Sequence, residues 1–478
     1  MTDPASDDRS PSLRRASRRA LLTGAGAAGI GLASAFSATA APAPTVGPAR
    51  PFAPRPSSQS SMIGVPFEPY DEVRVGIIGL GNRGMGMLPL FDAVPGVRIT
   101  AIADVRRERV REASDRLAAE GSRRPREYSR GPDDYQRLAQ ADDVDFVYIA
   151  TPWEEHYPQA AAALRGGKHV GIEPPIATEL DELWSLVDIS EEEGLHCLLM
   201  ENCSYGRQEL AMLKMAHEGL FGDITGGHGG YLHDLRDLLF SETYYYEQWR
   251  RRWHTQHNRA FYPMHGLAPI AAAMDVNRGD RMLTLQASST PARGLADYRE
   301  RNVDPDRAEV WDEEYVAGDR VTCMITTEQG RLIRAVHDVS TPRPYSRINT
   351  LAGSRGVLED YPSRIYLEPE HGDHQWQDSQ PYLDQHDHWL WQDIGDAAED
   401  HGGHGGMDYV LVYRLMQCMR QGLVPDIDVY DSAAWCAAVP LSEASLDSGG
   451  PVEIPDFTRG QWEESRPGLD SERAPLLE

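Results

Sequence analysis

The feature that most constrains this sequence is a glycine-rich turn between two apolar runs, within residues 73–104. Residues 73–78 read VRVGII, and a short apolar run of this kind predicts a buried parallel strand. Gly79, Gly81 and Gly84 follow in G-x-G-x-x-G spacing. Such glycines permit a tight turn, a close approach of backbone to a diphosphate, and packing of the next helix on the strand. With a strand before the turn and a helix after it, the motif predicts a dinucleotide site.

An acidic residue stands where such motifs place the group that binds the adenosine ribose. Asp104 ends the second apolar run, 20 residues beyond Gly84, and a carboxylate at this distance binds the ribose 2'-hydroxyl. Its charge would repel the 2'-phosphate of NADP, so we expect NAD as the cofactor. Arg106 and Arg107 follow closely and can offset that charge, which keeps NADP as the alternative. A strand–turn–helix without a cofactor is the other interpretation of the glycines.

The patterning of the chain changes partway, as expected for two domains. Its 478 residues exceed what one hydrophobic core usually holds. Up to Asn202, apolar runs alternate with helical segments, which predicts an α/β Rossmann domain with a doubly wound parallel sheet. Later runs such as 320–326 and 332–338 have less helix between them and predict an α+β domain with an open, mainly antiparallel sheet. The predicted organisation is a first domain at residues 71–203, a second at residues 204–462 whose helix near 406–421 returns to the first, and a tail at residues 463–478.

The first 70 residues carry a targeting pattern. Residues 17–22 (SRRALL) resemble a twin-arginine export signal, and residues 38–40 (ATA) suit cleavage. We expect residues 1–40 to be a signal peptide and the proline- and serine-rich residues 41–70 to be a linker. An anchored apolar helix is the alternative, but the run is short and glycine-rich for a membrane span. The twin-arginine route carries folded proteins, so an exported enzyme can keep a nucleotide acquired in the cytoplasm and must restore it in every turnover.

Charge and cysteine content exclude several classes of function. The formal net charge of −27 makes nucleic acid or an anionic membrane a poor partner. Five cysteines are scattered without paired metal spacing, so we expect buried apolar positions for them. The histidines of residues 384–388, together with His401 and His404, could hold a metal, but their acidic flanks favour a solvated loop. We therefore predict no metal.

Polar and aromatic groups gather at the predicted strand ends and in the segment that follows them. Trp153 and His156 come after one strand, in the crevice where the nicotinamide half is expected, although His156 can equally be structural. The further clusters are Glu173 with Glu201, Asn202 and Tyr205; residues 231–236; residues 262–266 with 274–280; and residues 343–345. Aromatic faces beside hydroxyl, imidazole and guanidinium groups suit a carbohydrate pocket, although each cluster alone could be surface decoration.

Several longer motifs resemble one family. They are GLGNRG, TPWEEH, GGYLHDLRDLLF, YPMHGLAPIAAAMDVNRGDR, HGGMDY and DVYDSAAWCAAVPLSEASL. The chain resembles the Gfo/Idh/MocA oxidoreductase superfamily and, within it, glycoside hydrolase family 109, whose founding activity is alpha-N-acetylgalactosaminidase. The YP-x-HG…MD-x-NRGDR block is specific to that group, and the resemblance extends from the export signal to about Trp462.

The resemblance implies glycoside hydrolysis without net redox change. A hydride leaves the sugar C3 for bound NAD+, a base removes the C2 proton, the C1 substituent is eliminated, water adds at C1, and C3 is reduced again. It implies that His265 handles the C3 hydroxyl proton and Tyr205 the C2 proton. The implied sugar-binding residues are Glu173, Arg236, Tyr262 and Tyr345. The implied cofactor-binding residues are Gly79, Gly81, Asn82, Arg83, Gly84, Asp104, Trp153, His156, Glu173 and Asn202.

One departure from the wider superfamily bears on the alternatives. Its ordinary dehydrogenases carry Glu-Lys-Pro with a catalytic lysine, whereas this chain has Glu173-Pro174-Pro175. The missing lysine counts against the main alternative, an exported sugar oxidoreductase with bound NAD(P), and the paired prolines leave the sugar preference open. A non-catalytic binding protein is a third possibility, while a two-carboxylate glycosidase lacks its paired acids. Because superfamily members commonly pair through the open sheet, a homo-oligomer is also expected.

Overall fold

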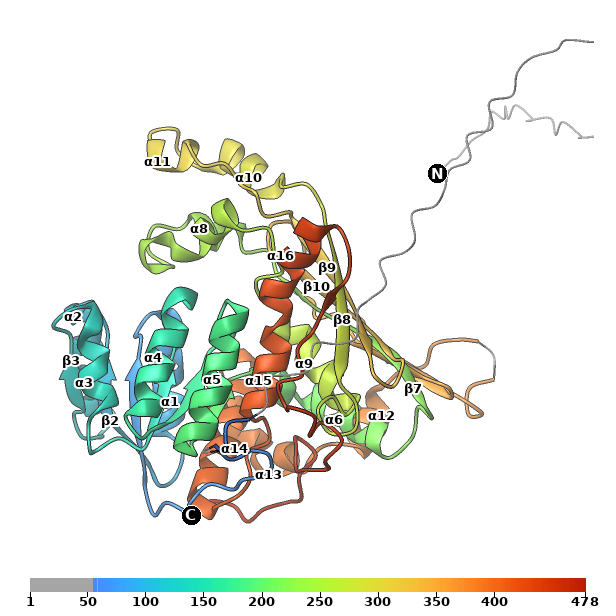
Figure 1. The fold of residues 1–478 in the computed structure, drawn as a ribbon, viewed down its shortest axis with the longest axis horizontal. Helices are drawn as coiled ribbons and strands as arrows, with labels where there is room; N and C mark the ends of the chain where they lie inside the picture. The colour runs from blue at the N-terminus through green and yellow to red at the C-terminus, as the bar shows by residue number, and fades with distance from the viewer. Residues whose placement is uncertain (1–54, 58, 373) are drawn as a thin grey trace, which may run out of the picture. The chain divides into compact units, whose positions relative to one another are not determined.

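The computed structural model describes residues 55–57, 59–372 and 374–478, so the predicted signal peptide lies outside the described residues (Figure 1). A six-stranded sheet with the order β3-β2-β1-β4-β5-β6 forms its first half. All neighbouring strands of this sheet run parallel. The strands are β1 Val73–Ile78, β2 Val97–Ala103, β3 Arg126–Tyr128, β4 Phe146–Ile149, β5 His169–Ile172 and β6 Cys197–Leu199. The predicted Rossmann sheet is confirmed, with its direction of winding reversed between β1 and β4.

Helices cover this sheet in two groups. Helix α1 packs against α2, and α4 packs against α3 and α5. A doubly wound sheet requires helices on both faces, because each right-handed crossover lies on the face set by its direction of winding. The helices are α1 Asn82–Asp92, α2 Arg107–Ala119, α3 Tyr135–Ala139, α4 Trp153–Arg165 and α5 Leu180–Glu193.

A second sheet of eight strands has the order β13-β12-β11-β7-β10-β9-β8-β14. Strands β7 and β10 pair in parallel, and the other neighbours pair antiparallel, which confirms the mainly antiparallel prediction. The strands are β7 Ile224–Leu232, β8 Met282–Ser289, β9 Arg320–Thr327, β10 Leu332–Asp338, β11 Thr350–Gly353, β12 Gly356–Glu359, β13 Arg364–Leu367 and β14 Val452–Glu453. In β9 the buried Val321, Cys323 and Ile325 alternate with more exposed residues, so one face is covered and the other is open.

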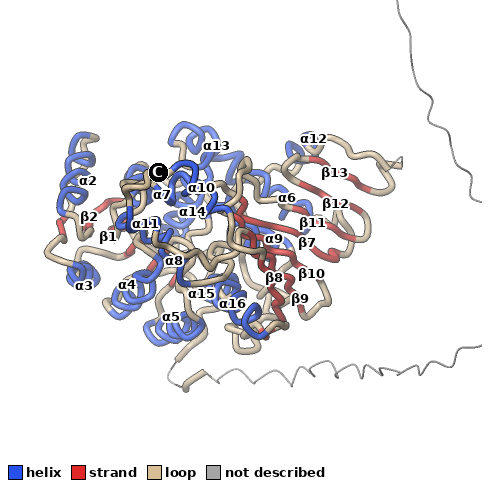
Figure 2. The backbone as a smooth tube through the Cα atoms, turned by 90° about the horizontal axis from the view of Figure 1, so that it is seen from above, coloured by secondary structure: helices blue, strands red, loops and turns tan. Residues whose placement is uncertain are grey.

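The remaining helices cover the second sheet and join it to the first. Helices α9 and α16 pack on β7 and β8 respectively. Figure 2 shows α14 and α15 between the two groups of strands, and α14 packs against α1. These helices are α6 Arg207–His217, α7 Arg236–Phe240, α8 Trp249–Gln256, α9 Met264–Ala273, α10 Gly294–Asn302, α11 Ala308–Trp311, α12 Gln380–Gln385, α13 Trp389–His401, α14 Met407–Gln421, α15 Val429–Cys436 and α16 Ala438–Ser448. In the described part of the chain, no helix combines the length and apolarity needed to cross a bilayer.

Candidate functional site

A cavity of about 800 Å³ lies at the carboxyl ends of the first sheet's strands. It is lined by the loops after β1, β2, β4, β5 and β6 and, from the second half of the chain, by residues of β7, α8, α9 and the turn before α14. Its volume falls within the usual range for small-molecule sites. The predicted cofactor residues that line it are Gly79, Gly81, Asn82, Arg83, Asp104, Trp153, His156, Glu173 and Asn202. Gly84 lies behind the lining.

The glycine-rich loop has the geometry that a diphosphate requires. Gly79 has a φ of 92°, and a Cβ there would lie 2.7 Å from the carbonyl carbon of Ala150. A Cβ on Gly84 would lie 1.9 Å from the carbonyl oxygen of Gly79. Helix α1 begins at Asn82, so its first backbone N–H groups have no partner within the helix. These groups and the helix dipole favour an anion, and the loop therefore fits the diphosphate of NAD.

Both oxygens of Asp104 are held by the loops around it. Oδ2 accepts the N–H of Leu80 at 2.7 Å, and Oδ1 accepts the N–H of Arg106 at 2.8 Å. The Arg106 guanidinium also donates to Oδ1 at 3.1 Å and stacks over the ring of Tyr246, 4.9 Å from its centroid. Asp104 is therefore fixed at the cavity wall, and Arg106 partly balances its negative charge. The sequence alone did not decide whether a nearby arginine would do so, and the preference for NAD over NADP depends on it.

A network of paired charges lies along the lining of the cofactor site. Arg83 lies 2.9 Å from Glu173 and 2.7 Å from Asp408. Asn202 donates to Asp408 at 2.7 Å, and its own Oδ1 has no hydrogen-bond partner among the described residues. Burial opposes the ionisation of Asp408, but the charge of Arg83 and the hydrogen bond with His404 lower its pKa. An orphaned acceptor beside a fixed carboxylate fits a hydroxyl- and amide-bearing cofactor.

Asp408 and His404 also line the cavity, a position that the sequence did not predict for either of them. Asp408 belongs to the HGGMDY motif, which carries part of the family resemblance, and His404 was considered only as a metal ligand. Both residues line the cavity although they lie about 200 residues beyond the other cofactor residues, in the turn before α14 and its first turn. The carboxylate at the start of α14 was the available signal, because a helix N-terminus stabilises a negative charge.

Trp153 and His156 both lie at the cavity, with different roles. His156 Nδ1 lies 2.7 Å from the carbonyl oxygen of Pro175, and Nε2 lies 2.8 Å from that of Thr151. Burial lowers the pKa of His156, while the hydrogen bonds to these two carbonyl oxygens oppose that shift, because each oxygen accepts an N–H; the ring joins the loops after β4 and β5. Trp153 stacks on Tyr262 with an interplanar angle of 27° and presents an aromatic wall. The structural interpretation of His156 thus accounts for both of its nitrogens.

Histidine and tyrosine side chains form the substrate side of the cavity. His265 lies in the first turn of α9, and its Nδ1 is 2.5 Å from Oε1 of Glu201. The rings of Tyr262 and Tyr231 meet it edge-on, with centroids 4.7 and 5.2 Å away. The Tyr231 hydroxyl lies 2.9 Å from Nδ1 of His233. Burial, followed by the charge of Arg250, lowers the pKa of His233 to about 4, so this imidazole is neutral near pH 7.

Arg250 is a further residue that the sequence interpretation missed. Its guanidinium lies over the rings of Trp153 and Tyr262, 5.1 Å from each centroid, and donates to the Tyr245 hydroxyl at 3.3 Å. Its Nη2 is buried without a hydrogen-bond partner among the described residues. Arg250 lines the cavity, and an unpartnered guanidinium donor there is suited to an oxygen acceptor of a ligand. Its sequence signal is the WRRRW segment at 249–253, inside the polar and aromatic stretch noted above.

Three residues predicted for catalysis or sugar binding do not line the cavity. The Tyr205 hydroxyl donates to Asp426 at 3.3 Å, and burial followed by the charge of Asp426 raises its pKa well above the usual range. Arg236 is paired with Asp234 through two nitrogens, each at 2.8 Å. Tyr345 packs edge-on against His233 at 5.1 Å and so supports a lining residue from behind. The geometry gives the proposed role of Tyr205 as a base no support.

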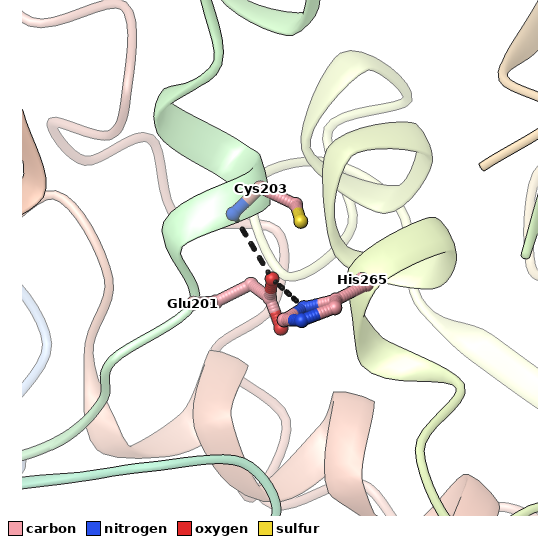
Figure 3. A group of neighbouring side chains, drawn as sticks. All are labelled: Glu201, Cys203 and His265. Carbon is pink, nitrogen blue, oxygen red and sulfur yellow. Dashed lines mark hydrogen bonds and ion pairs between the residues drawn. The ribbon is translucent and has the colours of Figure 1, made fainter. Parts of the chain in front are cut away.

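One group of described residues has the chemistry of metal ligands. Atoms of Glu201, Cys203 and His265 lie within 4.8 Å of one another (Figure 3). Burial raises the pKa of the Cys203 thiol well above its ordinary value, so the thiol is protonated at neutral pH. A protonated thiol is a poor ligand, since metals bind the thiolate. The prediction that the chemistry needs no metal remains a prediction.

Comparisons with known proteins agree along the whole folded chain. Residues 73–201 match the model of the oxidoreductase family with an NAD-binding Rossmann fold, and residues 205–464 match that of the glycosyl hydrolase 109 C-terminal domain. A glycosyl hydrolase family 109 protein of Streptomyces coelicolor is 61% identical over 467 residues, 95% of this chain and 97% of the relative. The alpha-N-acetylgalactosaminidase of Shewanella oneidensis is 41% identical over 457 residues, 94% and 98% of the two chains.

Solved structures share the fold at low sequence identity. Levoglucosan dehydrogenase in complex with NADH has a TM-score of 0.59 and 18% identity, covering 80% of this chain and all of the other. The apo scyllo-inositol dehydrogenase of Lactobacillus casei has a TM-score of 0.55 and 13% identity, covering 81% and 99%. At these identities the likeness concerns the arrangement of the two sheets and their helices.

Proposed function

Because this chain belongs to glycosyl hydrolase family 109 and is a glycosidase with an NAD-binding domain, we propose that it cleaves N-acetylgalactosaminides or related glycosides by oxidation, elimination, addition and reduction. One observation carries the proposal. A single cavity is lined by the diphosphate loop and Asp104 and also by His265 and Arg250. A sugar held by the second set therefore lies beside the cofactor held by the first.

NAD+, when bound, supplies the acceptor and later the donor of the sugar's C3 hydride. The residues that would hold it are Gly79, Gly81, Asn82, Arg83, Asp104 and Asn202. His265 removes the C3 hydroxyl proton as the C3 hydride leaves, so that C3 becomes a ketone, and it returns this proton in the final reduction. Its Nδ1 faces Glu201, which leaves Nε2 for the sugar. Imidazole suits proton exchange near neutral pH.

Tyr231 fits the second proton transfer better than Tyr205, because Tyr231 lines the cavity. Once C3 is a ketone, the C2 hydrogen is acidic, and loss of this proton expels the C1 substituent and leaves a C1–C2 double bond. Burial raises the pKa of Tyr231 and the charge of Arg250 opposes that rise, so the phenol carries its proton. To take the C2 proton, Tyr231 passes its hydroxyl proton to Nδ1 of His233, 2.9 Å away, and recovers it when a proton returns to C2. Water then adds at C1, a proton returns to C2, and C3 is reduced, so the net reaction is hydrolysis.

Arg250 and the aromatic wall bind the sugar in this proposal. The unpartnered Nη2 of Arg250 donates to a sugar oxygen. The apolar face of the ring packs on Trp153 and Tyr262, which are stacked with each other. An elimination at C1 with a C3 ketone tolerates either anomer, so the sugar is selected by these contacts and not by the configuration at C1.

The main rival is a sugar oxidoreductase with bound NAD(P). Glu173 is paired with Arg83 and is followed by two prolines, so no lysine lies at this point of the cavity. The test is a panel of aryl glycosides with purified protein and no added cofactor. A hydrolase releases the aglycone and incorporates deuterium at C2 in deuterated water. An oxidoreductase forms lactone or alditol with the glycosidic bond intact, and a binding protein does neither.

We propose further that the chain is exported by the twin-arginine route, on the pattern of residues 17–22. Replacing Arg18 and Arg19 by lysine should retain the protein in the cytoplasm, which fractionation of the expressing cells measures.

We also propose a homo-oligomer through the open face of the second sheet. Light scattering of the purified protein tests this, and a monomer at micromolar concentration would contradict it.

A further inference from the structure

We propose that Glu201 is a positioning residue that fixes the orientation and tautomer of His265 and stabilises this imidazole when it holds the proton from the sugar. The inference rests on the proposed role of His265 at the C3 hydroxyl. It adds a second residue to that step, one that touches neither the sugar nor the cofactor. Glu201 acts through its contact with the imidazole and does not line the cavity.

Two distant segments build this pair of side chains. Glu201 follows β6 and precedes a short 3-10 turn at Asn202–Tyr205, while His265 lies in the first turn of α9. Oε1 of Glu201 lies 2.5 Å from Nδ1 of His265 and also accepts the backbone N–H of Cys203 at 3.2 Å. Figure 3 shows the carboxylate between these two partners. The backbone contact holds the carboxylate in place, so the imidazole does not need to.

The two side chains of this pair differ in burial. The Glu201 side chain is fully buried, whereas that of His265 is 12% exposed and reaches the cavity. The other carboxylate oxygen of Glu201 has no hydrogen-bond partner among the described residues. The imidazole therefore supplies most of the favourable interaction that offsets the cost of burying the Glu201 carboxylate. A hydrogen bond to an ionised group is strong when water is excluded from it.

The chemical consequence concerns the two ring nitrogens. A neutral imidazole carries one N–H, and a carboxylate at Nδ1 accepts that N–H and leaves the lone pair on Nε2. Nε2 is then the atom that can take a proton from a sugar hydroxyl. Once protonated, the ring is a cation hydrogen-bonded to a carboxylate, and such charge-assisted hydrogen bonds are stronger than neutral ones. Removal of the charge on Glu201 should weaken both effects.

Other ionisable groups face the pair, and none of them replaces Glu201. These groups are Tyr231 from β7, His233 directly after it, Arg250 from α8, Tyr262 from the loop before α9, Cys203 from the 3-10 turn, and Glu173 from the loop after β5. Among the described residues, the hydrogen-bond partner of His265 Nδ1 is the Glu201 carboxylate, which accepts its N–H. The positive charge of Arg250 disfavours a protonated His265, which makes a compensating anion more important.

The test uses the full-length protein with its own NAD and two variants, Glu201→Gln and Glu191→Gln. Glu191 is the control because its side chain is also fully buried, pairs with Arg55 at 2.8 Å and accepts a hydrogen bond from Tyr430 at 2.7 Å, and does not line the cavity. We expect Glu201→Gln to lower kcat by about 10²–10³-fold, with KM nearly unchanged and NAD content retained. The acidic limb of its pH–rate profile should move to lower pH by about one unit or more. Glu191→Gln should leave kcat and the pH profile unchanged.

A conservative variant and a spectroscopic measurement complete the design. Glu201→Asp keeps the charge at a longer reach and should recover part of the lost kcat. Nitrogen-15 NMR of labelled protein, with the His265 signal assigned from His265→Gln, should show the N–H on Nδ1 in the wild type and a changed tautomer in Glu201→Gln. Wild-type kcat and pH profile in Glu201→Gln would overturn the inference, as would equal losses in both glutamine variants.

The NMR result separates this inference from the proposed function. If the wild type cleaves no glycoside, the proposed function fails, while the tautomer of His265 still tests the contact with Glu201. An N–H on Nε2 in the active wild type would overturn the positioning role of Glu201 and leave the glycosidase proposal standing.

Discussion

The two halves of the cavity are built in different ways. The cofactor half consists of the loops after β1, β2, β4, β5 and β6 together with Asp408; the substrate half consists of Tyr231, His233, Arg250, Tyr262 and His265. In the cofactor half, backbone shape and paired charges fix the site, as Gly84 and the Arg83–Asp408 pair illustrate. In the substrate half, contacts between aromatic rings hold the polar side chains in place, and these side chains keep hydrogen-bond donors and acceptors available to a ligand. The first half is suited to permanent occupancy and the second to exchange of ligands.

The largest expected effect is in the cofactor half, for Gly84→Ala. The new Cβ would lie 1.9 Å from the carbonyl oxygen of Gly79, a backbone atom, so the loop must move. We expect the purified variant to hold less than about one tenth of the wild-type NAD and to lose activity with it, because the diphosphate site depends on close backbone approach. Extraction and quantification of NAD measures this. Gly395→Ala in α13 is the control, since its Cβ would meet Trp391 at 3.4 Å, an ordinary contact.

The next largest effect is expected for His265→Ala, which should impair the substrate half and leave the cofactor half intact. We expect kcat to fall by about 10²–10⁴-fold because a general base is lost, while NAD content stays at the wild-type level. Steady-state kinetics on an aryl glycoside and NAD extraction measure the two quantities. His401→Ala, at an exposed histidine that ends α13, is the control. A near-wild-type rate in His265→Ala would remove this residue from the mechanism.

Arg250→Lys tests whether the substrate half depends on the fork of a guanidinium. A lysine keeps the charge and loses the directed Nη2 donor, so kcat/KM should fall by about 10–100-fold, as for a lost hydrogen bond to a charged group. NAD content should not change. Arg252→Lys, two residues along α8, should stay within about twofold although Arg252 also lines the cavity, because its side chain is exposed and its ion pair with Glu154, at 3.9 Å, is loosely held. Equal effects in both variants would indicate a general requirement for arginine in α8.

The two halves were not equally predictable from the sequence. The cofactor half follows from spacing, because strand ends of a parallel sheet meet at one edge and the glycine pattern fixes the first of them. Nine of its ten predicted residues line the cavity, and Gly84 acts from behind. Asp408 was missed because the contact of α14 with α1 brings it in from more than 300 residues beyond Arg83.

In the substrate half, the direction of each side chain determines whether the residue lines the cavity, and the spacing of residues in the sequence does not reveal that direction. Tyr205 and Arg236 stand beside lining residues in the sequence, yet their side chains are taken by Asp426 and Asp234. Arg250 was overlooked among three consecutive arginines, of which Arg251 pairs with Glu313 and Arg252 is exposed. The fold class, by contrast, could be predicted throughout, since hydrophobic periodicity distinguishes strands buried on both faces from those with one open face.

Acid should act on the two halves in sequence. The folded-state pKa of His233 is lowered to about 4, so the unfolded chain binds more protons below its ordinary value of 6.5. The contribution of neutral His233 to folding stability is therefore lost as pH falls from about 6.5 to about 4. The pKa of Asp408 is lowered, so the stability from its pairing is present above the ordinary value of 3.8 and declines only below it. At pH 5 the folded protein still holds His233 neutral, so we expect the free energy of unfolding to be lower than at pH 7 while NAD stays bound, measured by urea denaturation and by rapid gel filtration. Release of NAD at pH 5 with an unchanged free energy of unfolding would reverse this order.

The smallest expected effect concerns the discrimination between NAD and NADP. Asp104→Asn keeps an acceptor for the N–H of Leu80 and removes the charge that Arg106 balances. Because that charge is already partly compensated, reconstitution of stripped protein should show the preference for NAD falling by no more than about tenfold, the size of one charge-assisted contact. Asp104→Asn combined with Arg106→Ala should bind NADP more weakly than Asp104→Asn alone, since the freed guanidinium is the group available to a 2'-phosphate. If Asp104→Asn alone shifts the preference a thousandfold, the carboxylate acts with its full charge and the Arg106 contact does not attenuate it. The cofactor half would then reject NADP by charge repulsion, and its paired charges would serve only to retain the bound cofactor.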